Sequence, residues 1–483
     1  MDNYTKGRRF AYRLMVTALA TCATGMAHAA HPGDPDGSFG TGGSGYLTND
    51  FFGTDEEVFA LAPMRDGRFV AAGKVVATNI TGIGSSENMA IARYLPNGTL
   101  DPGFGSGGLV HIDIDSASDE ARALRVLPDN GILAAGSLST ASHADFGVVK
   151  LRADGSFDTT FGETDTGSTR KGYVRLDIAG ANFHDNGYAM AVQKDGRIVV
   201  AGTTPVFHDG FNYSQVALAR FTADGVVDTT FGGGDGVVIL DPFYGAASDV
   251  LTTIALDQAG NPGADGRIVV GGYTYGRNCA FLARVDANGS VDTTFAGTGR
   301  VVLEDANTGG VRTGMSLLYS ARISADGKLV ALGQGGDRGM TVMRFGANGA
   351  LDTTFGDNGR STIKISGSAT YDTAAALALQ GNGKLVAAGY TTSSATGSPH
   401  QDFFVGRWLA NGAIDTGFGD GGSRAVQVST RDDSAYAVAI EPSGNILAGG
   451  FALQPAATQP DFALLRLIGD PDRIFHDGFD GGF

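Results

Sequence analysis

The sequence predicts an all-β fold: a seven-bladed β-propeller of four-stranded blades, closed by an N-terminal strand that joins the last blade. Three observations predict it. A short motif recurs along the 483 residues at intervals near 60 residues, and each copy carries four short apolar runs. The two ends of the chain each hold part of one further copy. With 75 glycines, the chain also has the composition of a protein made of short strands and tight turns.

The recurring motif is Asp-x-x-Phe, followed by glycine in nearly every copy. A catalytic site needs one copy of a residue rather than seven, so we interpret the motif as structural. We expect its carboxylates to accept hydrogen bonds from backbone N–H groups of the turn. The copies are Asp36/Phe39, Asp101/Phe104, Asp158/Phe161, Asp228/Phe231, Asp292/Phe295, Asp352/Phe355 and Asp415/Phe418.

The four apolar runs of a unit, here called a, b, c and d, are separated by turns. Runs a and b are joined by Asp-Gly or Asn-Gly, as at Asp195-Gly196. Such pairs favour a two-residue hairpin turn with positive φ at both positions. Run b is apolar on both faces and closes on a glycine, as in 197–202, so it belongs inside a stacked sheet. A loop of variable length leads to run c, then come a second tight turn, the motif and run d. The closing glycines are Gly73, Gly136, Gly202, Gly272, Gly333, Gly389 and Gly450.

The chain ends favour a ring over a linear array. The chain starts with a motif and a d run in residues 33–50, and it finishes with a c run in residues 462–467 that has no d run after it. In a ring, the first strand completes the last blade and removes two open sheet edges. An open β-solenoid, the alternative, would need polar caps instead.

Charges also repeat inside these runs. A basic residue in run c and an acid at the start of run a predict a structural ion pair or turn cap in each blade, because a charge in an apolar strand needs a partner. The basic residues are Arg93, Lys150, Arg220, Arg284, Arg344, Arg407 and Arg466. The acids are Glu56, Glu120, Asp185, Asp249, Asp372 and Asp433, with Ser316 in their place in the fifth unit.

The N-terminal sequence has the pattern of an export signal. Four basic residues precede an apolar run, residues 14–27, that ends in Ala27-His28-Ala29, which predicts a signal peptide over residues 1–29. We expect the propeller to span 30–467, a C-terminal tail to span 468–483, and the mature protein to be secreted, periplasmic or on the cell surface. Only Cys279 remains after cleavage, so no intrachain disulfide forms.

The charge of −16 excludes classes of partner. It argues against nucleic acid and against anionic membrane surfaces, and no later stretch is apolar enough for membrane insertion. We expect a monomer without a cofactor. Calcium bound by the Asp-rich turns is the one cofactor that we keep open.

Candidate ligand-binding residues lie where the copies differ. With alternating strand directions, the b–c loops and d–a connections share one face, and variable loops on a rigid scaffold are where recognition is usually placed. Histidines with neighbouring acids on this face suggest a metal or acid–base site, with the metal unknown, and Tyr213 with Phe207 and Phe211 offers aromatic contact. The candidates are His143, His184, Asp185, His208, Asp209, Tyr213, His400 and Asp402.

Two phrases, Asp-Gly-Ser-Phe-Asp-Thr-Thr-Phe-Gly (154–162) and Asn-Gly-Ala-Leu-Asp-Thr-Thr-Phe-Gly (348–356), carry a resemblance to a known family. With the upstream Asp-Gly-Arg-Ile-Val-Val-Ala-Gly (195–202), they resemble the delta-60 repeat family over residues 33–467. The resemblance implies exported or surface bacterial proteins with propeller-like repeats, and it brings no catalytic residues.

The favoured function is therefore a secreted, non-enzymatic propeller that binds an extracellular or envelope ligand through its b–c and d–a loop face. The ligand would be a glycan, a peptide or an envelope protein. Two alternatives stay open: a hydrolase or lyase with a His/Asp site at the mouth of the ring, and a purely structural repeat protein of the cell surface.

Overall fold

The computed structural model describes residues 30–470, apart from 78–85, 165–168, 181, 243–246, 258–265, 276–278, 305–310, 313, 336–338, 365–371, 394–399 and 456–458. The predicted signal peptide and the tail beyond Asp470 lie outside the described residues. The chain divides into residues 1–30 and residues 31–483, and the architecture below is that of the second unit.

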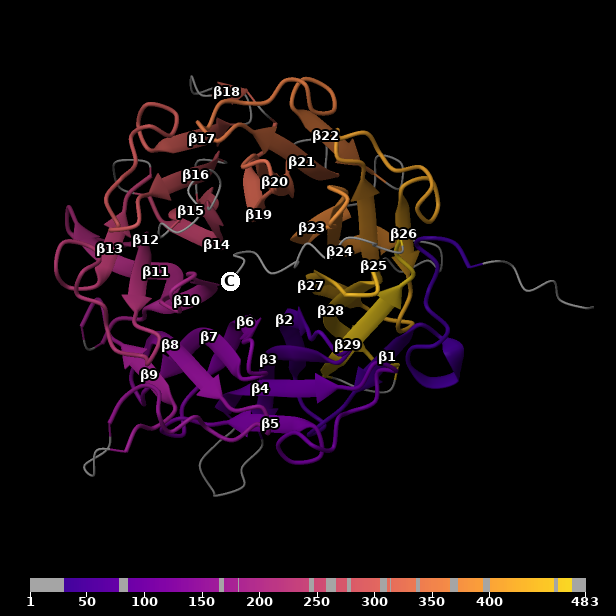
Figure 1. Ribbon diagram of the computed structural model, residues 1–483, viewed down its shortest axis with the longest axis horizontal. Coiled ribbons are helices and arrows are strands. Elements are labelled where there is room, and N and C mark those ends of the chain that lie inside the picture. Colours follow the sequence, from indigo (N-terminus) through magenta and orange to yellow (C-terminus); the bar gives the residue numbers. More distant parts are fainter. Residues whose placement is uncertain are drawn as a thin grey trace, which may run out of the picture. The chain divides into compact units, whose positions relative to one another are not determined.

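Seven sheets, in each of which strands a to d are antiparallel, stand around a ring with the a strands innermost, as Figure 1 shows. This confirms the predicted seven-bladed propeller. We number the blades in chain order and give each from strand a to strand d. Blade one is β2 (Glu56–Pro63), β3 (Phe69–Ala77), β4 (Ser86–Tyr94) and β5 (Leu109–Ile112). Blade two is β6 (Glu120–Val126), β7 (Ile132–Ser139), β8 (Ala144–Leu151) and β9 (Tyr173–Leu176). Blade three is β10 (Asn186–Val192), β11 (Ile198–His208), β12 (Phe211–Phe221) and β13 (Val237–Leu240).

The remaining blades follow the same order. Blade four is β14 (Asp249–Asp257), β15 (Arg267–Thr274), β16 (Cys279–Val285) and β17 (Arg300–Glu304), and it gains a fifth, parallel strand, β18 (Val311–Arg312). Blade five is β19 (Leu317–Ile323), β20 (Leu329–Gln334), β21 (Met340–Phe345) and β22 (Arg360–Ile363). Blade six is β23 (Asp372–Leu379), β24 (Leu385–Ser393), β25 (His400–Trp408) and β26 (Ser423–Val426). Blade seven is β27 (Asp433–Ile440), β28 (Ile446–Leu453), β29 (Pro460–Leu467) and β1 (Tyr46–Asn49), preceded by a short 3₁₀ helix, η1 (Thr41–Gly43).

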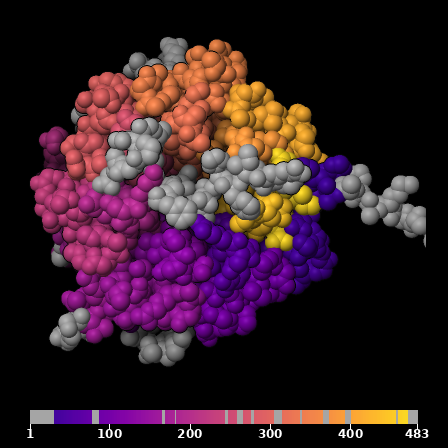
Figure 2. Space-filling view, in the orientation of Figure 1, coloured from indigo at the N-terminus to yellow at the C-terminus, as the bar shows by residue number. Residues whose placement is uncertain are grey.

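The N-terminal strand closes the ring, as the chain ends predicted. Strand β1 pairs antiparallel with β29, so that Tyr46 lies opposite Leu465 and Thr48 opposite Ala463. In Figure 2 the indigo start of the described chain lies against the yellow seventh blade. Phe39 and Leu47 are fully or almost fully buried in one cluster with residues of β29 and of blade one. The N-terminal segment is therefore part of the core.

The core lies between neighbouring blades, because the b and c strands are buried on both faces. All eight residues of β7 and all seven of β16 are buried. Each hydrophobic cluster combines residues of adjacent sheets; Val199 and Val216 of blade three pack with Ile268 and Phe281 of blade four. This stacking of blades explains why the b runs of the sequence are apolar at every position.

The predicted two-residue a–b turns are wrong in detail. In the first, Gly67 N–H donates to Met64 C=O at 3.2 Å, and Met64 N–H donates to Arg68 C=O at 2.7 Å. Only Gly67 has a positive φ, of 86°. The loop is thus a three-residue type I turn followed by a glycine bulge. A two-residue turn with positive φ at both positions occurs instead at Asp209-Gly210, in a b–c connection.

Every a strand contains a β-bulge opposite the closing glycine of strand b. In blade three the register shifts between Gly187 and Ala189, so Tyr188 is the extra residue. A Cβ on Gly202 would lie 1.9 Å from Asn186 C=O. The same approach of 1.8–2.1 Å recurs at every closing glycine. Glycine recurs there because the bulge brings the backbone of strand a too close for a side chain.

The described part of the chain contains no helix with the length and hydrophobicity that a membrane span requires.

Candidate functional site

The repeated motif ties each blade to the next. In blade three, Arg220 Nε donates to Asp228 Oδ2 at 2.8 Å, and its guanidinium lies 4.6 Å from the centre of the Phe231 ring. Arg220 Nη1 donates to Ala287 C=O in the c–d turn of blade four. The guanidinium is therefore buried with an ionic, a stacking and a hydrogen-bonding partner. The equivalent ion pairs are Arg93–Asp101, Lys150–Asp158, Arg284–Asp292, Arg344–Asp352, Arg407–Asp415 and Arg466–Asp36.

The motif phenylalanines are core residues and do not face a ligand in solvent. All seven are at most 1% exposed. In six blades an arginine guanidinium lies 4.5–4.7 Å from the centre of the phenylalanine ring. Besides Arg220 on Phe231, these pairs are Arg93 on Phe104, Arg284 on Phe295, Arg344 on Phe355, Arg407 on Phe418 and Arg466 on Phe39. The rings pack into the hydrophobic clusters between blades, so the structure gives Phe104, Phe295, Phe355 and Phe418 a packing role.

A backbone bond reinforces each tie. The residue after the motif phenylalanine donates its N–H to the c–d turn of the next blade, as Gly232 does to Asn288 C=O at 3.0 Å. Blade seven has no c–d turn of this kind, since its d strand comes from the other end of the chain. Pro32 C=O takes the acceptor role for Gly419 N–H at 2.8 Å, and Asp470 accepts from Arg407 Nη2 at 3.2 Å. The motif residues therefore have structural partners in every blade.

The motif aspartates are held in the ionised form. Burial opposes ionisation of Asp228, but hydrogen bonds from Thr230 and the charges of Arg220 and Arg197 outweigh it and lower its pKa. The pKa values of all the other motif aspartates are lowered as well.

The acids at the start of the a strands cap the d–a connections. Asp433 accepts N–H bonds from Phe403, Val428 and Ser429 at 2.8–3.1 Å. The prediction for blade two is wrong, because the residue equivalent to Asp433 there is the buried Asp119 and not Glu120. Asp119 accepts from Ile114 N–H and Ser139 N–H, whereas Glu120 pairs with Arg122.

Burial dominates the ionisation of three of these caps. It raises the pKa of Glu56, of Asp119 and of Asp433 to about 7 each, even though backbone N–H bonds act in the opposite direction. All three carboxyl groups belong to residues that are fully buried.

The structure brings His143, His184 and Asp185 together, at the junction of blades two and three. His184 Nδ1 accepts from Ala144 N–H at 3.1 Å, and Asp185 N–H donates to Ala144 C=O at 2.7 Å. Asp185 itself is fully buried and accepts from Ile178 N–H, Ala179 N–H and the Thr204 hydroxyl. Asp185 is thus a d–a cap whose oxygens are occupied.

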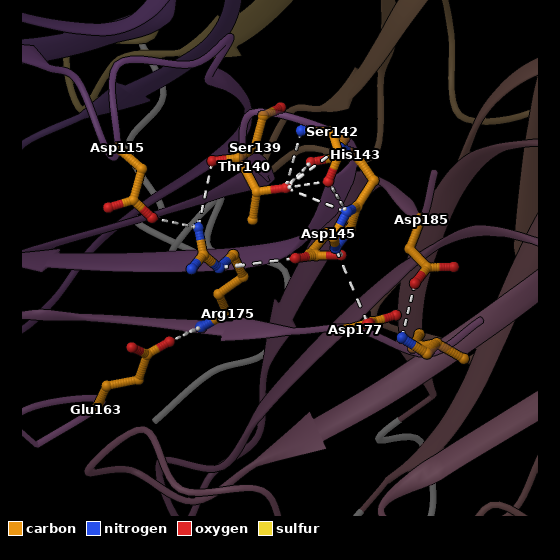
Figure 3. A network of polar contacts seen from close by, with 12 residues as sticks. Asp115, Ser139, Thr140, Ser142, His143, Asp145, Glu163, Arg175, Asp177 and Asp185 are labelled. Atoms are coloured by element: carbon orange, nitrogen blue, oxygen red, sulfur yellow. Dashed lines mark hydrogen bonds and ion pairs between the residues drawn. The ribbon is translucent and has the colours of Figure 1, made fainter. Parts of the chain in front are cut away.

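His143 lies in a wider polar network that Figure 3 shows. Its Nε2 is 3.4 Å from Asp145 Oδ1 and 3.9 Å from Asp177 Oδ2. Arg175 Nε is 3.6 Å from the other oxygen of Asp145. Burial raises the pKa of Asp145 to about 6, although the charges of His143 and Arg175 oppose this. The sequence placed Asp145 beside His143, but Asp177 joins them only through the pairing of β8 with β9.

His208, Asp209 and Tyr213 lie on a projecting hairpin, since β11 and β12 pair as far as His208 opposite Phe211. The predicted loop is therefore a strand extension. Phe207 and Phe211 are 70% and 66% exposed, and His208 Nε2 lies 3.2 Å from Asp209 Oδ2.

His400 and Asp402 lie in blade six, with His400 Nε2 at 3.3 Å from Asp402 Oδ1. Gln427 Nε2 is 3.0 Å from the same nitrogen. The predicted candidates therefore divide into three groups, one at the junction of blades two and three, one on the hairpin and one in blade six.

A central channel has a volume of about 490 Å³, and residues of all seven a strands line it. No histidine is among the described residues that line it. The histidine candidates are therefore not part of this lining, and the His/Asp site stays a prediction.

The bulged residues form one ring of side chains in this channel. Each occupies the extra position of its a strand, and four of the seven are aromatic. They are Phe59, Arg122, Tyr188, Thr252, Tyr319, Ala375 and Tyr436. We call this set the channel ring. Because the bulges lie in the first half of each a strand, the channel ring lies toward the b–c and d–a loop face.

Contacts within the channel ring join neighbouring blades. The Phe59 ring lies 6.0 Å from that of Tyr436, and the Arg122 guanidinium lies 3.8 Å from the Phe59 ring centre. Arg122 Nε also donates to Glu120 Oε2 at 2.6 Å. Thr252 turns its hydroxyl to backbone carbonyls, so it offers the channel no free donor.

Residues that follow the closing glycines lie beside the channel ring. Phe451 lies 5.7 Å from Tyr436, and Gln334 Oε1 lies 3.5 Å from the Tyr319 hydroxyl. Tyr273 packs edge to face with the exposed Tyr275 at 5.7 Å. Burial raises the pKa of Tyr273 to about 12, and it raises those of Tyr188, Tyr319 and Tyr436. These phenols are neutral hydrogen-bonding groups on half-buried aromatic surfaces.

Charged side chains lie beside the channel ring on blades one and two. Lys74 Nζ pairs with Glu87 at 2.7 Å, and the positive charges of Lys74 and Arg122 attract the Glu57 carboxylate. Burial raises the pKa of Glu57 despite these two cations. The mouth therefore has an aromatic part on blades three, five and seven that meets a charged part at Phe59.

Sequence reasoning missed the channel ring, because its members share neither residue type nor motif. The one available signal was position: each stands directly after the residue that pairs with the closing glycine. Reading that position required knowledge of the bulge.

Six segments of the chain match the model of a family described as "Domain of unknown function (DUF5122) beta-propeller": residues 66–104, 127–161, 193–231, 263–295, 324–355 and 380–418. Each segment runs from an a–b turn to the motif phenylalanine, ending at Phe104, Phe161, Phe231, Phe295, Phe355 and Phe418. They are the six copies that are continuous in sequence, whereas the seventh is divided between the chain ends. The matches support a propeller-repeat family. No curated protein matches the chain.

Solved structures resemble the chain distantly. Sqt1 from Chaetomium thermophilum is 12% identical, with 88% of this chain and 91% of that chain covered and a TM-score of 0.40. The intramolecular trans-sialidase from Ruminococcus gnavus is 12% identical (88% and 98% covered, TM-score 0.36). The GH93 alpha-L-arabinofuranosidase of Fusarium graminearum is 7% identical (88% and 98% covered, TM-score 0.40). Likenesses this weak carry no argument about the activity of this chain.

Proposed function

We propose that the protein is a non-enzymatic binding propeller that takes an extracellular or envelope glycan at the mouth of its central channel. The observation that carries this proposal is the channel ring, in which Phe59, Tyr188, Tyr319 and Tyr436 line one concave mouth with Arg122. Aromatic surfaces with a few polar groups are the usual lining of a ligand pocket.

The chemistry of the mouth suits a sugar better than an apolar ligand or a polyanion. Ring faces such as that of Tyr436 can stack on the C–H faces of a pyranose, while the tyrosine hydroxyls, Arg122 and Glu57 can bond its hydroxyl groups. The chain carries a formal charge of −16, which repels polyanions.

A binding role fits the state of the carboxylates near the mouth. Glu120 is engaged by Arg122 and Glu87 by Lys74. A glycoside hydrolase at the same mouth is the second candidate. The observation in its favour is that burial raises the pKa of Glu57, as a general acid requires, while Glu120 lies close enough to contribute to that shift.

A glycan array on the mature protein, followed by calorimetric titration of the best ligand, tests the proposal. Tyr188→Ala and Tyr436→Ala should each weaken binding at least about tenfold, a loss of ~1.4 kcal/mol. Phe207→Ala and Tyr213→Ala, which remove aromatic rings from the hairpin outside the channel, are the matched controls and should leave affinity unchanged. The reverse pattern would contradict the channel site.

The same ligand separates the two candidates. Prolonged incubation followed by chromatography should return it intact if the protein only binds. Release of products, abolished in Glu57→Gln while affinity is kept, would instead support the hydrolase.

We also propose that the protein is exported and belongs to the delta-60 repeat family, as the N-terminal sequence and the repeated phrases suggest. The mass of the protein recovered from culture fractions tests export. A mature chain beginning at Ala30, outside the cytoplasm, is expected, whereas an intact Met1 terminus on a cytoplasmic protein would contradict it.

A further inference from the structure

We propose that His143, Asp145 and Asp177 form a binding site for a first-row divalent transition metal such as Zn²⁺, at the loop face of blade two and separate from the central channel. The three candidate ligand atoms are His143 Nε2, Asp145 Oδ1 and Asp177 Oδ2, which all lie within 4.8 Å of one another. Two of the separations, 3.4 Å from Nε2 to Asp145 Oδ1 and 3.9 Å from Nε2 to Asp177 Oδ2, are within the ~4.4 Å that two ligands of one ion can span at bond lengths of about 2.2 Å.

The histidine is held in the orientation of a metal ligand. Its Nδ1 lies 2.8 Å from Ser142 Oγ and 3.1 Å from Thr140 Oγ1. When Nδ1–H donates to one of these hydroxyls, Nε2 presents its lone pair to the two carboxylates. A second hydrogen bond of this kind fixes the tautomer of most metal-binding histidines.

A buried carboxylate oxygen in the site favours a cation as its partner. Asp145 is 2% exposed, and its Oδ1 has no hydrogen-bond partner among the described residues although it faces Nε2 of His143. A buried carboxylate oxygen without a donor costs free energy. A cation among Nε2, Oδ1 and Oδ2 would satisfy all three atoms.

The surrounding charges allow a divalent ion. Arg175 lies on the far oxygen of Asp145, at 3.6 Å from Oδ2, so it leaves Oδ1 open. Asp115 offsets the charge of Arg175 through a contact of 2.8 Å. Imidazole combined with carboxylate favours zinc-like ions, whereas calcium prefers oxygen ligands alone.

Blade six provides an internal comparison. His400 and Asp402 occupy the positions of His143 and Asp145, with the same approach of 3.3 Å between Nε2 and Oδ1. Directly after the d strand, however, blade six has Gln427 where blade two has Asp177. The second carboxylate ligand is therefore present in blade two and replaced by a neutral amide in blade six.

Titration of the chelator-treated protein with Zn²⁺, and with Co²⁺ for its visible absorption, tests the site. We expect one tight equivalent per chain, lost or weakened at least about thirtyfold in His143→Gln and Asp177→Asn, and retained in His400→Gln. Circular dichroism of each metal-free variant checks its fold. Gln427→Asp should add a second equivalent, a gain that does not depend on whether the blade two variants fold.

Two results would overturn the proposal. One is the absence of a saturable Zn²⁺ equivalent in the parent protein. The other is a stoichiometry and affinity that His143→Gln and Asp177→Asn leave unchanged, which would place the metal elsewhere.

Discussion

At the scale of single residues, the ties between blades depend on guanidinium groups that serve several partners at once. Arg220 is almost fully buried, yet it contacts Asp228, the Phe231 ring and a carbonyl of the next blade. Burial of such a charge is tolerated only because every direction of its planar group is occupied. Lysine at the equivalent position in blade two, Lys150, lies farther from its ring, at 5.8 Å from Phe161.

Removal of one guanidinium should therefore be costly. Arg220→Met leaves Asp228 buried with Arg197 as its remaining cation, so we expect a loss of about 3 kcal/mol in the free energy of unfolding. Urea titration measures it. The exposed Arg152, which bonds Thr159, provides the control: Arg152→Met should change stability by less than about 0.5 kcal/mol. Equal effects for the two variants would contradict the role of the tie.

The buried caps predict how stability depends on pH. Glu56, Asp119 and Asp433 bind a proton more tightly when folded, with pKa values of about 7 against ordinary values of 4.5 and 3.8. Their stabilisation is complete below the ordinary values and is lost as pH rises to about 7. The motif aspartates have lowered pKa values, so they contribute above pH ~4 and lose that contribution below it.

The melting temperature should consequently be highest near pH ~4.5 and should fall from there to pH ~7. Asp433→Asn, which cannot ionise, should flatten the decrease between pH ~4.5 and ~7. Differential scanning calorimetry across this range provides the test. A melting temperature that rises steadily to pH ~7, or an unchanged profile in Asp433→Asn, would count against the assignment.

At the scale of the element, the bulged a strand joins the core to the candidate site. The bulge turns one extra side chain per blade into the channel, and it brings the backbone of strand a against the closing glycine of strand b. The candidate binding surface and the recurrence of glycine along the repeat thus have one geometric cause.

Substitution of a closing glycine tests that geometry. In Gly202→Ala the new Cβ would overlap Asn186 C=O, so the bulge must shift, and we expect a loss of about 1–3 kcal/mol or more. Gly417, with an ordinary contact of 3.5 Å, is the control, and Gly417→Ala should cost less than about 0.5 kcal/mol. Unfolding titrations compare the two variants. A neutral Gly202→Ala would show that the backbones do not approach as described.

The repeats in the sequence predicted the architecture, but the sequence did not predict features that depend on contacts between strands. Blade number, strand order and ring closure followed from the spacing of the motif and from the divided seventh copy. Asp119 was missed because the next residue, Glu120, is also acidic. Only the fold shows which of the two side chains caps the d–a connection. The channel ring and Asp177 were missed because their neighbours come from other strands, whose pairing no local pattern encodes.

At the scale of the whole molecule, both chain ends complete one blade, and all other features depend on this closure. Pro32 and Asp470 supply the contacts between blades six and seven that c–d turns provide elsewhere, and Asp36 completes the motif ion pair of blade seven with Arg466. An open array would leave one edge of β29 unpaired and the N–H of Gly419 without its acceptor, and Phe59 would not meet Tyr436 across the junction.

A disulfide between β1 and β29 tests closure most directly. In a chain with Cys22→Ser and Cys279→Ala, Thr48→Cys and Ala463→Cys face each other, so mild oxidation of the folded protein should link them and raise the melting temperature. Asn49→Cys with Ala463→Cys, one residue out of register, should not link efficiently, since adjacent residues of a strand face opposite sides. If neither pair links, or if both link equally well, the N-terminal strand does not complete the seventh blade as described.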